Sequence, residues 1–163
     1  MQIVLHLCGP AGEASRREIA HFLTGLKADN RWVIRALMEG GDAVPETMWD
    51  VHNVSPGGCV YRPPDEHESL TPEQHFYCIA DMIERGEFSC GDAAAYEAAV
   101  VEEVYGVPAE ILVVAQGSSE YHALFVTEEG PIDPTENWIR EWSNEAGIEY
   151  KPPVRGANRW RRS

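Results

Sequence analysis

Cysteine is scarce in this sequence, and its few copies are far apart. The 163 residues hold four cysteines, Cys8, Cys59, Cys78 and Cys90. That number and spacing exclude the dense disulfide framework of a small secreted domain. Histidines stand near two of these cysteines, but no second pair follows at zinc spacing, so we expect no metal site and no cofactor. Apart from Cys90, the cysteines are expected to be buried thiols.

Basic residues are also few, except at the end of the chain. There are 13 Lys and Arg against 27 Asp and Glu, which gives a net charge of −14. Five of the basic residues lie in 151–163, which has no acid, so residues 1–150 carry about −19. An acidic body repels phosphate, which argues against nucleic-acid binding. We expect 151–163 to be a solvated, flexible tail; the alternative is a segment that docks on an acidic partner through its arginines and Trp160.

Long apolar runs are absent. No stretch approaches the roughly 18 residues that a membrane helix needs. The start, MQIVLHLCGPAG, has no basic region and too short an apolar run for a signal peptide. We therefore expect no membrane contact and a cytoplasmic protein. The length and the ordinary fractions of apolar and charged residues predict one globular domain over 1–150.

Hydrophobic periodicity predicts an α+β fold. The expected elements are a strand at 2–7, a helix over 16–40 with a break near 27–30 as an alternative, a long loop at 40–58, a strand at 59–62, helices at 71–86 and 91–105, strands at 111–115 and 121–127, and a short helix around Trp138 and Trp142.

The helix expected at 71–86 has clear end signals. Thr71 is a good N-cap, Pro72 fits the first helical position, and Gly86 is a typical C-terminal stop. Phe76 and Ile79 begin its apolar stripe. The next helix, which Cys90 opens, also ends at a glycine, Gly106.

Cys90 stands at the start of that next helix, in the run FSCGDAAAYEAAVVEEVY. The unpaired N–H groups and partial positive charge of a helix N-terminus favour a thiolate over a thiol. The same N–H groups, including that of Cys90, point to where an oxyanion would develop. Many cysteines at helix starts are inert core residues, so position alone leaves both interpretations open.

Two downstream residues favour the reactive interpretation. His122 lies in the strand EYHALFV, and Asp133 precedes Pro134, which favours an extended backbone at the edge of a strand. A cysteine, a histidine and an acid in this order are typical of a nucleophile, a base and the group that orients the base. Taken alone, His122 would more often be a hydrogen-bonded structural residue.

The motifs Cys90-Gly91-Asp92, Tyr121-His122-Ala123 and Asp133-Pro134-Thr135 together resemble those of the transglutaminase-like cysteine protease superfamily. The likeness is greatest to its small single-domain members from phages, and it covers about 60–138. It implies a papain-like core in which the cysteine-bearing helix packs on an antiparallel sheet. It also implies Cys90 as nucleophile, His122 as general base and Asp133 as its orienter. Phe88-Ser89, where similar proteins commonly carry a Gly-Asp or Gly-Xaa pair, is a departure.

The resemblance implies a cysteine peptidase or amidase that acts on a protein or peptide through a thioester. If an amine replaces water as acceptor, the same chemistry is that of a transglutaminase. A different class of function also stays open, a non-catalytic module in a phage-type assembly, docked through the basic tail. For Asp92 we favour a structural role, because the helix dipole stabilises a carboxylate there without any catalytic duty.

Overall fold

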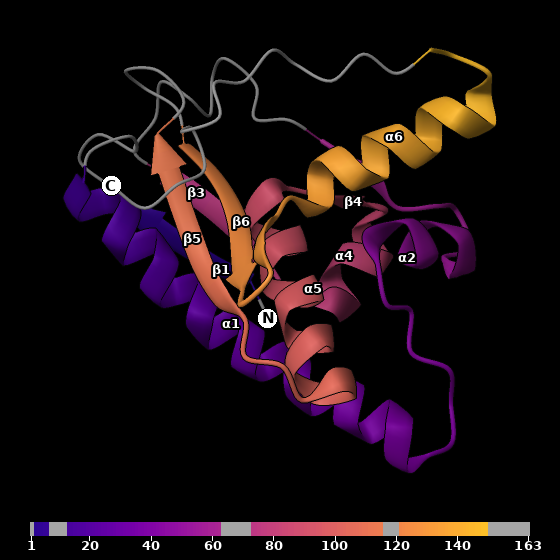
Figure 1. Cartoon of the computed structure of the whole chain (residues 1–163), viewed down its shortest axis with the longest axis horizontal. Helices are drawn as coiled ribbons and strands as arrows, with labels where there is room; N and C mark the ends of the chain where they lie inside the picture. The colour runs from indigo at the N-terminus through magenta and orange to yellow at the C-terminus, as the bar shows by residue number, and fades with distance from the viewer. Residues whose placement is uncertain (1, 7–12, 63–72, 116–120, 150–163) are drawn as a thin grey trace.

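The computed structural model describes residues 2–6, 13–62, 73–115 and 121–149, and it confirms an α+β fold (Figure 1). The basic tail lies outside the described residues, as does Cys8. The elements are β1 (Gln2–His6), α1 (Glu13–Glu39), α2 (Met48–Val54), β2 (Val60–Tyr61), β3 (Glu73–Tyr77), α4 (Ile79–Arg85), β4 (Glu87–Phe88), α5 (Cys90–Tyr105), β5 (Glu110–Ala115), β6 (Tyr121–Thr127), β7 (Gly130–Ile132) and α6 (Pro134–Ala146).

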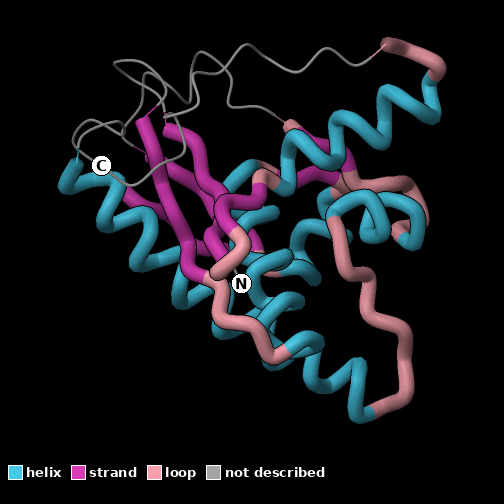
Figure 2. Tube along the Cα trace, viewed as in Figure 1, coloured by secondary structure: helices cyan, strands magenta, loops and turns pink. Residues whose placement is uncertain are grey.

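The described strands form three small sheets. Antiparallel β5, β6 and β7 make the largest, β1 pairs antiparallel with β3, and β2 pairs in parallel with β4. In the largest sheet Val114 is opposite His122, and Phe125 is opposite Ile132. Figure 2 shows β5 and β6 side by side along the long helix α1. This sheet positions the strand that carries His122.

Helix α1 is continuous, so the alternative of a break near 27–30 is wrong. Its apolar residues recur at helical spacing, and Ile19, Leu23 and Leu26 are fully buried. Asn30, in the expected break, is also fully buried. Its Oδ1 accepts a hydrogen bond of 3.1 Å from the backbone N–H of Ile79. The start of α4 thus satisfies the side-chain oxygen of this buried residue, while its Nδ2 has no partner among the described residues.

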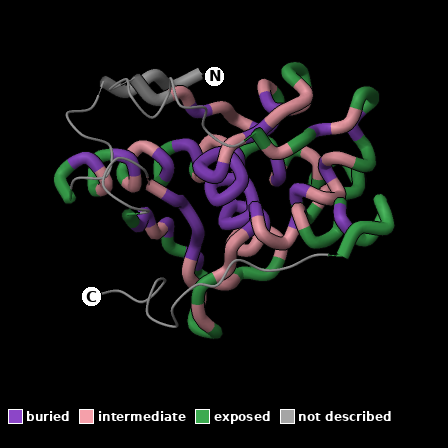
Figure 3. Tube along the Cα trace, turned by 90° about the horizontal axis from the view of Figure 1, so that it is seen from above, coloured by how far each residue is buried: buried purple, intermediate pink, exposed green. Residues whose placement is uncertain are grey.

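Helix α5 forms the centre of the molecule, and its first eleven residues are all buried (the purple coil in the middle of Figure 3). Its alanines allow α1 and the sheet to approach closely, and Ala94, Ala95 and Ala98 belong to the main apolar cluster. At Gly91 a Cβ atom would lie 2.8 Å from Cε1 of Phe76. Only glycine fits there, which explains the residue that follows Cys90.

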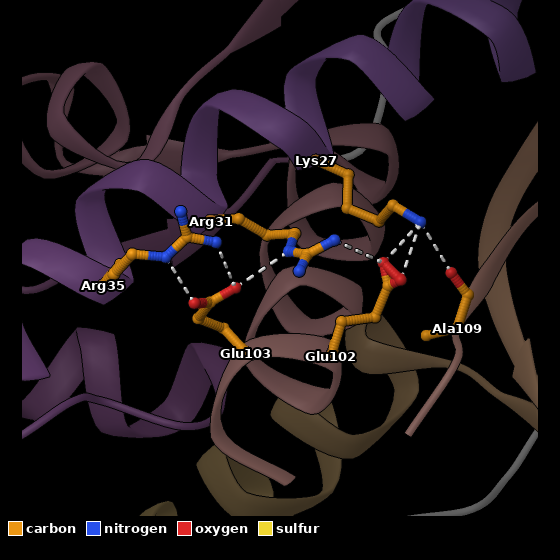
Figure 4. A network of polar contacts seen from close by, with 6 residues as sticks. All are labelled: Lys27, Arg31, Arg35, Glu102, Glu103 and Ala109. Atoms are coloured by element: carbon orange, nitrogen blue, oxygen red, sulfur yellow. Dashed lines mark hydrogen bonds and ion pairs between the residues drawn. The ribbon is translucent and has the colours of Figure 1, made fainter. Parts of the chain in front are cut away.

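Partly buried charged residues join α1 and α5 (Figure 4). Lys27 Nζ lies 2.7 Å from Oε1 of Glu102 and donates to the carbonyl of Ala109 at 2.9 Å. One turn further along, Glu103 accepts from Nε of Arg31 at 2.9 Å and from Nε of Arg35 at 2.7 Å. These bonds join α1 to α5 beside their apolar contact, which continues to Ile34.

The helix predicted over 71–86 is wrong in its first half. Residues Glu73–Tyr77 form β3, and only Ile79–Arg85 is helical. Pairing with β1 decides this, and the alternation is that of a strand, since Phe76 is buried between two half-buried neighbours. Cys78 is the N-cap of α4 in an extended conformation, while Gly86 ends the helix as predicted. The expected cap, Thr71, lies outside the described residues.

The loop predicted over 40–58 contains the short helix α2. Thr47 is its N-cap, and its side chain and that of Asp50 exchange hydrogen bonds with each other's backbone N–H groups. This capping box was visible in the sequence as Thr-x-x-Asp. Met48 and Val51 are fully buried, which fixes α2 to the body of the protein.

Candidate active site

Cys90 is the first residue of α5, where the sequence predicted it. The preceding residue, Ser89, is the N-cap, and its side chain accepts from the N–H of Asp92 at 3.3 Å. Cys90 itself is 3% exposed and belongs to the main apolar cluster. The thiol therefore lies at the buried end of the central helix.

His122 and Asp133 meet directly. Nε2 of His122 lies 2.8 Å from Oδ2 of Asp133. Asp133 follows β7 in an extended conformation and is the N-cap of α6, where its Oδ1 accepts from the N–H groups of Thr135 at 3.2 Å and Glu136 at 3.3 Å. One carboxylate oxygen thus caps the helix while the other binds the imidazole. The sequence predicted the extended backbone before Pro134 but not this second duty as a cap.

The hydrogen bonds of His122 also reach Cys90. Burial by itself would lower the pKa of His122, but hydrogen bonds to Asp133 and Cys90, together with their charges, outweigh burial and raise the pKa to about 9. Because Nε2 faces Asp133, Nδ1 is the ring nitrogen left for the thiol. The fold therefore brings together the three residues singled out in the sequence. An imidazole held between a thiol and a carboxylate can exchange protons with the thiol.

Asp92 binds backbone N–H groups. Its Oδ1 accepts from the N–H of Tyr77 at 2.7 Å, and its Oδ2 accepts from the N–H of Ser89 at 3.0 Å. The carboxylate thus completes a capping box on α5 and ties the end of β3 to it. Burial raises the pKa of Asp92 to about 7, against the opposing effect of these bonds. This geometry agrees with a structural role.

Glu97 is a buried residue that the sequence analysis missed. It lies on α5 and is 6% exposed, and its Oε2 accepts from the N–H of Met48 at 3.1 Å. Burial raises the pKa of Glu97 to about 8, and the charges of Asp50 and Asp133 add to that rise. The signal in the sequence was a lone glutamate within the run AAAYEAAVV, which is otherwise apolar.

The other described cysteines differ from Cys90 in their surroundings. Cys59, Cys78 and Cys90 are all free thiols. Burial raises the pKa of Cys59 to about 12, with a further rise from the charges of Asp92 and Glu87. The Sγ of Cys78 lies 3.4 Å from Oδ2 of Asp81. Cys59 contacts a histidine through its backbone, whose N–H donates to Nδ1 of His52 at 3.1 Å.

Three groups with raised pKa values predict that stability falls as the pH rises. The folded state holds a proton on Asp92 from its ordinary pKa of 3.8 up to about 7, on Glu97 from 4.5 up to about 8, and on His122 from 6.5 up to about 9. Between its ordinary pKa and its folded-state pKa, each group is protonated in the folded protein but deprotonated in the unfolded chain. The stabilisation is therefore complete below the ordinary pKa and is lost as the pH rises through the folded-state pKa.

We therefore expect the free energy of unfolding to be greater at pH 5 than at pH 9, by a few kcal/mol, since each group changes it by at most about 1.4 kcal/mol per pH unit. Urea titrations across this range check it. Glu97→Gln should reduce the slope between pH 5 and 8, and Glu145→Gln, at an exposed position of α6, should leave it unchanged. A stability that rises towards pH 9 would contradict the assignment.

The described residues hold neither a membrane-length apolar helix nor a group of three potential metal ligands. No protein-family model, no curated protein and no solved structure matches this chain significantly.

Proposed function

We propose that the protein is a cysteine acyl-transfer enzyme, a peptidase or amidase, with Cys90 as nucleophile, His122 as general acid and base, and Asp133 as the residue that orients His122. One observation carries this proposal. His122 bonds Asp133 at 2.8 Å and also bonds the Cys90 thiol, at the N-terminus of the central helix. Three groups that lie 11 to 43 residues apart in the sequence thus form one hydrogen-bonded chain.

The chemistry follows from the protonation of this chain. A pKa of about 9 keeps His122 protonated at neutral pH, beside the sulfur. A protonated imidazole next to a cysteine is the arrangement that favours the thiolate. The thiolate of Cys90 attacks a carbonyl carbon, and the N–H groups at the start of α5 face the developing oxyanion. His122 gives its proton to the departing amine as the C–N bond breaks, which leaves a thioester on Cys90.

The second half-reaction consumes the thioester. His122, now neutral, takes a proton from water as its oxygen attacks the thioester carbonyl, and Cys90 leaves as a thiolate. The products are a carboxylic acid and the starting enzyme. If a primary amine attacks in place of water, the product is a new amide, so hydrolysis and transamidation share every protein group named above.

The arrangement of α5 and the β5–β6–β7 sheet supports the papain-like, transglutaminase-like core as part of this proposal. The cysteine opens the helix, the histidine follows in a strand of an antiparallel sheet, and the acid follows the next strand. The low exposure of Cys90 favours the second candidate, a non-catalytic module in which the triad is only packed. The reactivity of the Cys90 thiol distinguishes the enzyme from the non-catalytic module.

The experiment is alkylation with limiting iodoacetamide at pH 7, followed by mass spectrometry of the peptides that contain each cysteine. We expect Cys90 to react at least about tenfold faster than Cys59 and Cys78, because the imidazole bonded to the Cys90 thiol favours the thiolate. Equally slow labelling of all three thiols would overturn the enzymatic proposal in favour of the packed module. Incubating wild type and Cys90→Ala with proteins encoded beside this one, and comparing cleavage and cross-linking, then identifies the substrate and the acceptor.

A further inference from the structure

A pocket of about 490 Å³ lies between α2, α5 and α6, next to the residues described above. Its lining consists of Thr47, Trp49, Asp50, Glu97, Pro134, Asn137, Trp138, Arg140 and Glu141. Neither Cys90 nor His122 lines it, but Pro134 directly follows Asp133. The volume is within the usual range for sites that take a small group or a side chain.

Glu97 is the unusual group in this lining. Glu97 is 94% buried, and its Oε2 accepts a hydrogen bond from the backbone N–H of Met48. Among the described residues no partner is assigned to Oε1. A buried carboxylate without a cation is costly, so this group keeps its proton near neutral pH, in agreement with its pKa of about 8.

The walls of the pocket are aromatic. Trp49 and Trp138 meet edge to face, with ring centroids 6.1 Å apart. Trp138 is 6% exposed, and its indole N–H has no acceptor among the described residues. Indole faces bind both the alkyl stem and the charged head of a cationic side chain.

The charges around the pocket are mainly negative. Asp50 on α2 and Asp133 at the start of α6 raise the pKa of Glu97 through their charges. Glu141 and Arg140, both on α6, complete the charged lining, and the guanidinium of Arg140 donates to Oδ1 of Asn137 at 3.3 Å. Tyr96, the neighbour of Glu97 on α5, donates its hydroxyl proton to the carbonyl of Pro45. The set attracts a cation rather than an anion.

We propose that this pocket binds the cationic side chain of a peptide, an alkylammonium or guanidinium group, with Glu97 as its ionic partner at the floor and Trp49 and Trp138 against its stem. Binding converts the carboxylic acid of Glu97 to a carboxylate and releases its proton to solvent, so the ion pair forms without a net buried charge.

The position of Glu97 suggests what the pocket contributes. Glu97 follows Cys90 by seven residues, which is two helical turns on the same face and about 10 Å along the axis. An extended peptide covers that distance in about three residues. If the catalytic function proposed above holds, the pocket is a specificity subsite for a basic residue about three positions from the attacked carbonyl. The binding itself does not depend on catalysis.

The test uses the full chain carrying Cys90→Ala, which cannot form a thioester. The probe is Nα-acetyl-lysine N-methylamide, compared with its uncharged norleucine analogue, and the readout is the NMR shift of the five indole N–H signals. We expect saturable shifts with the lysine probe and at least about tenfold weaker binding of the norleucine probe, because the ion pair is lost. Equal affinity for the two probes, or no saturable shift with lysine, overturns the proposal.

Two further measurements isolate Glu97. Glu97→Gln keeps an acceptor for Met48 and should weaken lysine binding at least about tenfold, while Glu145→Gln, at an exposed position of α6, should not. If Glu97→Gln does not fold, calorimetry of the Cys90→Ala protein at pH 7 in two buffers of different ionisation enthalpy remains decisive. We expect release of close to one proton per lysine bound, and the absence of release overturns the proposal. An inert thiol in the wild type would overturn only the catalytic function.

Discussion

Replacing His122 with alanine is expected to slow the alkylation of Cys90 at pH 6 by on the order of 100-fold. An unperturbed cysteine, with a pKa of about 8.5, is less than about 1% thiolate at that pH, whereas a cysteine paired with an imidazolium is largely thiolate. The lower intrinsic nucleophilicity of a stabilised thiolate offsets part of this gain. Turnover of any amide substrate should fall by about 10²–10⁴, the usual contribution of a general acid and base.

The pH profile makes this test specific. Wild-type alkylation should stay fast down to mildly acidic pH, whereas that of His122→Ala should fall about tenfold for each pH unit below 8, because it follows the thiolate fraction of an isolated cysteine. His21→Ala, at an exposed position on α1, is the matched control and should change neither rate nor profile.

Since His122 is buried, the melting temperature of the variant has to be checked, and His122→Gln, which retains a polar group for Asp133, serves as a second variant. Identical rates for wild type and both variants would show that the thiol works without the histidine, and the proposed triad would fail.

Replacing Asp92 with alanine is expected to lower the free energy of unfolding by about 3 kcal/mol. The change removes the acceptor of two backbone N–H groups, those of Tyr77 and Ser89. A buried donor left without a partner costs about 1–3 kcal/mol, and the loss of a helix cap costs about 1 kcal/mol more. For a domain of total stability about 5–15 kcal/mol, this is a large fraction.

The chain provides its own control for this substitution. Asp50 makes the same capping box at the start of α2, but its bonds lie near the surface, where water replaces them. Asp50→Ala should therefore cost about 1 kcal/mol or less. Urea unfolding of the two variants at pH 7 gives the comparison. Equal losses would show that burial and the bond to Tyr77 add nothing to an ordinary cap.

The secondary structure was predictable where local signals and periodicity agreed. The helix opened by Cys90 and closed by Gly106, and the strands around Val113 and His122, lie where the apolar pattern placed them. The prediction was wrong at β3. There, good helix-start signals preceded a segment whose partner strand, β1, is about 70 residues away, and no local pattern reports such a pairing.

The candidate site, too, was predictable from the sequence only in part. The sequence supplied the order of a cysteine at a helix start, a histidine in a strand and an acid before a proline, and the fold places these three residues in contact. Their catalytic roles stay a prediction. The sequence predicted no functional role for Glu97, because a single glutamate in a helix is unusual only once its burial and its neighbours are known.

By itself the sequence determined the α+β class, the acidic charge of the body and the helix start that carries Cys90, because composition, periodicity and capping act over a few residues. Only the tertiary structure decided that Asp92 binds the end of β3, that Glu97 binds Met48, and that Glu97, Trp49 and Trp138 line one pocket. The physical reason is that buried polar groups must find partners. Those of Glu97 and Asn30 are each 49 residues away along the chain, where no local pattern can identify them.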